Sequence, residues 1–106
     1  MLRQALVLKL KPGKLDEYIY HHDRIPTEWP RLHAALKDCG IHAIRTFAAE
    51  PLLFLYANVE DENAFPRLWD TDAHKEWANV MDPLIELDAE MRPDARFIKQ
   101  IFNFEA

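Results

Sequence analysis

Apolar and polar residues alternate near the start of the chain, in its middle and at its end, which is typical of half-buried β-strands. In the first of these stretches, leucines occupy positions 6, 8 and 10 on one face, before Pro12-Gly13 interrupts the pattern. In the middle, two such stretches are separated only by Ala49-Glu50-Pro51, which favours an antiparallel hairpin. The predicted strands cover residues 2–10, 41–48, 52–59 and 96–104.

In the first half of the chain, the segment between the strands has apolar residues three and four apart, as in amphipathic helices. We expect a first helix to begin at Lys14 and to end where Pro26 removes a backbone donor. A second helix should be capped by Thr27 and terminate at Gly40.

The second half of the chain repeats this alternation of strand and helix patterns. A short helix over residues 61–69 should be limited by Pro66. A longer helix should be capped by Asp72 and end at Pro93-Asp94, before the last predicted strand.

The element order βαββαβ predicts one α+β domain over residues 1–106, with the ferredoxin-like arrangement of an antiparallel sheet covered by helices on one face. One strand carries Leu53 and Leu55 on one side and Phe54 and Tyr56 on the other, so both of its faces are apolar. The uncovered face therefore needs a partner, and a twofold homodimer is the simplest one.

Composition and charge narrow the partners and the compartment. Thirteen Lys and Arg against eighteen Asp and Glu give a net charge of −5, which disfavours nucleic acid as a partner. No apolar run approaches the roughly 20 residues of a membrane span. With a single cysteine and no signal-peptide pattern, we expect a cytoplasmic protein.

Tyr18 and His22 are the main candidates for chemistry, because a spacing of four residues brings them onto one helix face. An imidazole with a pKa near 6.5 exchanges protons at neutral pH. The alternative is that both are core groups whose polar atoms are hydrogen-bonded internally. His21 lies about 100° round the helix and should be solvated.

The sequence gives little support for a metal site, a nucleotide cofactor or a catalytic cysteine. His33, His42 and His74 are scattered over three elements, and no zinc-type ligand spacing occurs. The chain has only two glycines, so no phosphate-binding loop is present and we expect no cofactor. Cys39 has no base beside it and is expected to be a buried thiol.

Trp77 is a candidate for a binding surface, since an aromatic face suits the apolar side of a sugar or a methyl group. Core packing is the competing interpretation. The neighbouring Asp70-Thr71-Asp72 is expected to cap a helix.

These residues together resemble the L-rhamnose mutarotase family along almost the whole chain. The likeness is carried by Tyr18-x-x-x-His22, Trp29-Pro30-x-Leu32, Leu52-Leu53-Phe54, Thr71-Asp72, Trp77-x-x-x-Met81 and the aromatic C-terminal strand. The resemblance implies a dimeric α/β barrel that interconverts the α and β anomers of a 6-deoxy-L-hexose, L-rhamnose or L-fucose. It also implies that His22 is the proton donor and that Tyr18 and Trp77 contact the monosaccharide.

The sequence departs from the family pattern at three places. Pro26-Thr27-Glu28 lengthens the loop after Ile25, Ile44 stands where the family has a tyrosine, and Trp77-Ala78 replaces a pair of tryptophans. Reaction type is therefore better supported than sugar identity.

Two other functions fit the same residues. A cofactor-independent monooxygenase of the antibiotic-biosynthesis type looks similar in fold, and fold alone does not decide function. A non-catalytic dimeric binding module would need Tyr18 and His22 only as core groups.

Overall fold

Four strands form one antiparallel sheet in the computed structural model, which describes residues 1–106. The spatial order β2-β3-β1-β4 and the α+β ferredoxin-like arrangement agree with the prediction from the element order. The strands are β1 (Leu2–Lys9), β2 (Ile41–Ala49), β3 (Leu52–Val59) and β4 (Arg96–Ile98).

The predicted hairpin of β2 and β3 is confirmed, with Thr46 opposite Leu55 and Phe47 opposite Phe54. β1 pairs with the other edge of β3 and places Leu6 opposite Leu55. Directly opposed residues share a face, so Leu6, Thr46 and Leu55 lie on one side of the sheet and both phenylalanines on the other.

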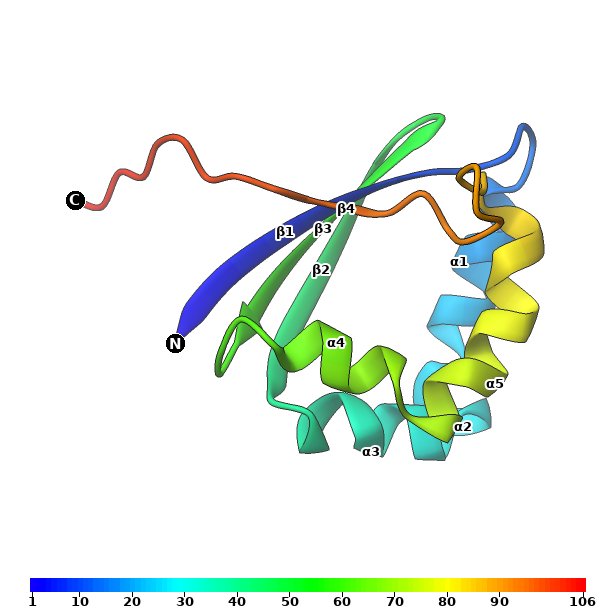
Figure 1. Ribbon diagram of the computed structural model, residues 1–106, viewed down its shortest axis with the longest axis horizontal. Coiled ribbons are helices and arrows are strands. Elements are labelled where there is room, and N and C mark those ends of the chain that lie inside the picture. Colours follow the sequence, from blue (N-terminus) through cyan, green and yellow to red (C-terminus); the bar gives the residue numbers. More distant parts are fainter.

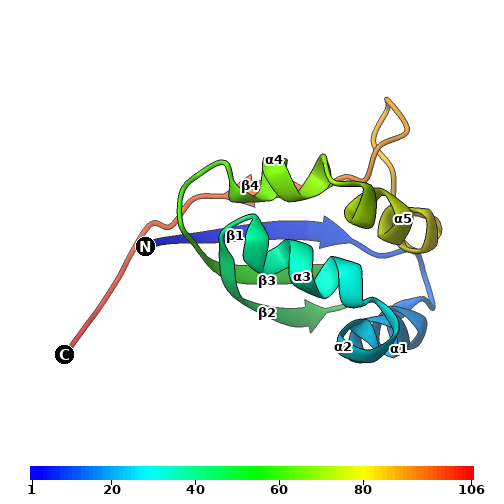
Figure 2. The ribbon, with the colours of Figure 1, turned by 90° about the horizontal axis from the view of Figure 1, so that it is seen from below.

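All the helices lie on one side of the sheet (Figures 1 and 2). Two of them run beneath the strands, whereas the first and the last long helix lie at the same end of the sheet. None combines the length and the apolar character that a membrane crossing needs. They are α1 (Leu15–Asp23), α2 (Ile25–Glu28), α3 (Pro30–Asp38), α4 (Ala64–Trp69), α5 (Asp72–Met81) and the 3₁₀ turn η1 (Asp82–Leu84).

The prolines of the first half do not act where the sequence suggested. α1 ends at Asp23, and Pro26 lies in the first turn of α2 instead of ending α1. Thr27 is inside α2, and α3 begins at Pro30 after Trp29. A proline fits the first turn of a helix because those N–H groups have no intrahelical acceptor.

The second half needs similar corrections. Pro66 is in the first turn of α4, where it does not limit the helix. The cap of α5 is Thr71, whose side-chain oxygen accepts from the backbone N–H of His74 at 3.1 Å, so Asp72 is the first helical residue. The helix ends at Met81, well before Pro93, because Pro83 tightens the chain into η1.

The last strand is much shorter than predicted. Only Arg96–Ile98 pair with β1, whereas residues 99–106 run on without a strand partner. This tail leads away from the helices (Figure 1) and exposes Ile101, Phe102 and Phe104.

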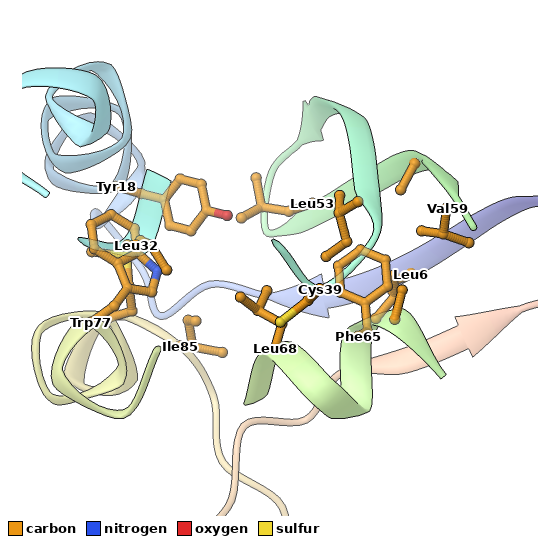
Figure 3. Packing of buried hydrophobic residues seen from close by; sticks show 14 of the residues in the cluster. Leu6, Tyr18, Leu32, Cys39, Leu53, Val59, Phe65, Leu68, Trp77 and Ile85 are labelled. Carbon is orange, nitrogen blue, oxygen red and sulfur yellow. The ribbon is translucent and has the colours of Figure 1, made fainter. Parts of the chain in front are cut away.

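The core lies between the sheet and the helices that cover it (Figure 3). Leu53, Ala57 and Val59 of β3 are almost completely buried. They form one buried cluster with Phe65 and Leu68 of α4. Gly40 ends α3 with a φ of 90°, a left-handed conformation that glycine adopts without strain.

Candidate active site

Tyr18 and His22 stack on each other on the inner face of α1. Their ring centroids are 3.9 Å apart and the ring planes differ by 23°. Tyr18 is only 6% exposed, whereas His22 is half-buried. The phenol points away from α1 towards Leu53 (Figure 3). Burial alone shifts the pKa of its hydroxyl, and no hydrogen bond to a protein group engages it. It is therefore available to a ligand.

A backbone hydrogen bond fixes the tautomer of His22. Its Nδ1 lies 2.9 Å from the carbonyl oxygen of Tyr18. A carbonyl oxygen can only accept, so Nδ1 carries the hydrogen and donates it. In the neutral ring, Nε2 then has an unshared electron pair and no protein partner, which makes it a proton acceptor.

Trp77 also packs against this imidazole, in an edge-to-face arrangement. The centroids of His22 and Trp77 are 4.9 Å apart, with the planes at 79°. Trp29 meets Trp77 edge-on at 5.0 Å. The structure thus brings together His22, Tyr18 and Trp77, the three residues selected from the sequence, and adds Trp29 as a support behind Trp77.

Burial keeps both polar rings uncharged at neutral pH. Desolvation lowers the pKa of His22, and the hydrogen bond to Tyr18 offsets part of this effect. Desolvation also raises the pKa of Tyr18 well above its ordinary value. The site therefore offers a neutral imidazole and a protonated phenol.

These rings line a cavity of about 650 Å³ between the sheet and the helices. That volume is in the usual range for small-molecule sites. Leu8, Thr46 and Leu55 form part of its floor on the sheet. Most of the lining is apolar, and its polar members are His22, Thr46, His74, Lys75, Asp82, Asp88 and Arg92.

The α5 side of the cavity contributes polar residues that the sequence analysis did not select. Among them are His74 and Asp82, and the apolar Ala78 lines the cavity between them. They are four residues apart, so they form one stripe along the helix and its 3₁₀ extension. Burial lowers the pKa of His74 and raises that of Asp82. The four-residue spacing could have placed these residues on one helix face, although not on the cavity.

The remaining candidates lie apart from the cavity. His21 does not line it and lies 3.8 Å from the Glu17 carboxylate. Cys39 is buried, as expected for a structural thiol. No three His, Cys, Asp or Glu side chains converge on a point that a metal ion could occupy.

Two of the departures from the family pattern fall on the cavity wall. Ile44 lines it from β2 and Ala78 from α5. The third departure, Pro26-Thr27-Glu28, makes up most of α2, whose first residue Ile25 also lines the cavity. The changes therefore alter the shape of the cavity and leave the Tyr18–His22 pair in place.

The fold and the cavity define a small α+β protein of ferredoxin-like type whose cavity is lined by an imidazole, a phenol and an indole. The model of the L-rhamnose mutarotase family matches residues 3–104. The chain belongs to this family, and the resemblance inferred from the sequence is confirmed. An L-rhamnose mutarotase from Shouchella clausii is 34% identical over 96% of this chain and 97% of its own length. One from Bacillus subtilis is 33% identical over 99% of this chain and 100% of its own length.

Solved structures agree with this assignment. An L-rhamnose mutarotase from Formosa agariphila superposes with a TM-score of 0.80 at 25% identity, covering 99% of this chain and 100% of its own. An antibiotic biosynthesis monooxygenase has a TM-score of 0.61 at 10% identity, covering 95% of this chain and 99% of its own. The second likeness concerns the fold alone.

Proposed function

We propose that this mutarotase interconverts the α and β anomers of a 6-deoxy-L-hexose, with L-rhamnose the first candidate and L-fucose the second. The observation that carries the proposal is the anchored neutral imidazole of His22, whose Nε2 has no protein partner at a cavity with room for a monosaccharide. Family membership supplies the reaction class, and the wall of this cavity supplies the preference for the sugar.

His22 is the proposed proton carrier. Its Nε2 takes the proton of the anomeric hydroxyl as the bond between C1 and the ring oxygen breaks. The imidazolium then acts as proton donor to the ring oxygen, which leaves the open-chain aldehyde. Reclosure reverses these transfers. Protons move and the bond between C1 and the ring oxygen breaks and reforms, with no change of oxidation state, so the reaction needs no redox cofactor.

Tyr18 and Trp77 are the proposed sugar contacts. The hydroxyl of Tyr18 has no protein partner and stays protonated, so it can donate to a sugar oxygen. Trp77 and the aliphatic floor suit the methyl group that a 6-deoxyhexose carries in place of a hydroxyl. Such apolar contacts discriminate by roughly 1 to 3 kcal/mol.

A panel of aldoses tests the function and the preference together. Saturation transfer between the anomeric protons measures the exchange directly, with no coupling enzyme. We expect acceleration for L-rhamnose and L-fucose ahead of glucose and galactose. If no aldose were accelerated by the folded protein, the proposed function would be wrong.

A homodimer is the proposed assembly, because several apolar side chains lie exposed on the sheet face away from the helices. Phe47 is 60% exposed and lies in register with Phe54 and Val7. Tyr56 and Ile98 follow in the next row, 37% and 42% exposed. Burying this face against its copy would close the sheets into a dimeric barrel. Sedimentation at micromolar concentration should give twice 12.5 kDa, and a stable monomer would contradict the proposal.

A further inference from the structure

The stripe of His74, Ala78 and Asp82 is a second polar wall of the cavity, on a different helix from His22. At 1.5 Å per residue, its two polar ends are roughly 12 Å apart along the helix axis. The alanine between them has only a methyl group, so space remains above it. His74 is also one turn from Trp77, whose ring centroid lies 4.9 Å from that of His22. His22 and His74 therefore line one cavity from two different helices.

The ring nitrogens of His74 have no protein partner. By contrast, His22 donates to the Tyr18 carbonyl, and His42 is bonded to Glu60 at 2.9 Å. Only the backbone N–H of His74 is engaged, with the Thr71 hydroxyl. Desolvation lowers the pKa of the imidazole, so it is neutral at pH 7 with one donor and one acceptor unused.

Mutarotation itself creates a need for a second group. The two anomers carry the C1 hydroxyl on opposite sides of the ring, because the carbonyl turns about the C1–C2 bond before reclosure. One imidazole in a fixed position faces that oxygen in only one of the two anomers. Reclosure to the other anomer would therefore gain from a second proton carrier on the opposite side.

We propose that His74 is a second catalytic residue of the mutarotase, which serves the anomer whose C1 hydroxyl points away from His22. This inference rests on the proposed function. In ring opening at His22, the proton passes from the C1 oxygen to Nε2 and on to the ring oxygen, which receives the electron pair of the broken C1 bond. In reclosure at His74, the ring oxygen forms the new bond to C1 and gives its proton to one nitrogen of the imidazole. The same nitrogen then delivers a proton to the C1 oxygen, so each imidazole begins and ends neutral.

His74→Gln and His74→Ala test this role, with His33→Gln as the matched control, because His33 is exposed on α3 and does not line the cavity. Saturation transfer gives kcat and KM for L-rhamnose. The methyl glycoside of L-rhamnose, which cannot open, gives the affinity without chemistry. Circular dichroism and the unfolding temperature confirm that each variant is folded.

For both His74 variants we expect kcat to fall by roughly 10²-fold, the effect of losing one acid/base group, with KM and glycoside affinity within about 3-fold. Added imidazole should restore exchange in His74→Ala, where it fits the vacated space. The His33→Gln control should match the parent.

A His74→Gln protein that keeps the parent's kcat would overturn the role of His74, since glutamine hydrogen-bonds but does not carry protons. A loss confined to glycoside affinity would overturn it as well and make His74 a binding residue. A parent protein that exchanges no aldose would instead contradict the proposed function.

Discussion

The two helices that border the cavity hold their histidines in different ways. On α1, the Tyr18 carbonyl anchors Nδ1 of His22, and Tyr18 and Trp77 contact its ring. On α5, His74 has no hydrogen-bond partner for its ring and stands one turn before the small Ala78. The imidazole of His22 is therefore held in one orientation, whereas no hydrogen bond holds that of His74.

The difference shows what each wall can contribute. An anchored ring presents one lone pair at a fixed position, which suits a proton transfer that depends on geometry. A ring without partners can turn to meet a ligand, although its side-chain entropy then falls on binding. Mutations on the inner face of α1 should therefore lower the exchange rate most strongly. His21, which does not line the cavity, is the control on the same helix.

The largest effect is expected for His22→Ala. Removing the anchored proton carrier should lower anomer exchange by roughly 10² to 10⁴-fold. The fold should persist, because His22 is only half-buried and lines a cavity instead of filling the core. Saturation transfer with L-rhamnose measures the loss. Exchange at the parent's rate would remove His22 from the mechanism and leave the α5 wall as the candidate.

A smaller effect is expected for Tyr18→Phe, which keeps the ring stacked on His22 and removes one hydroxyl. Losing a hydrogen bond of about 0.5 to 1.5 kcal/mol should reduce kcat/KM by roughly 2- to 10-fold. The backbone carbonyl that anchors His22 remains in place. A loss as large as that of His22→Ala would mean that the phenol itself carries a proton.

The smallest effect is expected for His21→Ala. This histidine does not line the cavity, and its ring lies 3.8 Å from the carboxylate of Glu17 on the same helix. Exchange should stay within about 2-fold of the parent. A large loss in the His21→Ala variant would mean that His21, and not His22, faces the sugar.

The strands were predictable because alternation has one simple cause, burial on one face of a sheet. The limits of the helices were not, because Pro26 and Pro66 occur in first turns, where proline is tolerated, and a sequence pattern does not reveal the turn. The tail after Ile98 alternates like a strand, yet no neighbouring strand in the chain pairs with it.

The candidate site was predictable in part for a related reason. The four-residue spacing placed Tyr18 and His22 on one face, and the stacking follows from it. His74 was judged by its distance from the other histidines along the sequence. Its place on the cavity depends on how α5 packs at the end of the sheet, which is a tertiary property.

The central claim is that a neutral His22 carries the proton, and its titration tests this most directly. NMR should find hydrogen on Nδ1 of His22 and, because desolvation outweighs the other effects, a pKa below the ordinary 6.5. kcat/KM for L-rhamnose should then be constant above pH 6.5 and fall only as the pH drops through that lowered pKa, where His22 becomes protonated. A kcat/KM that rises as His22 is protonated, or that does not change as the pH passes through the pKa of His22, would contradict the account.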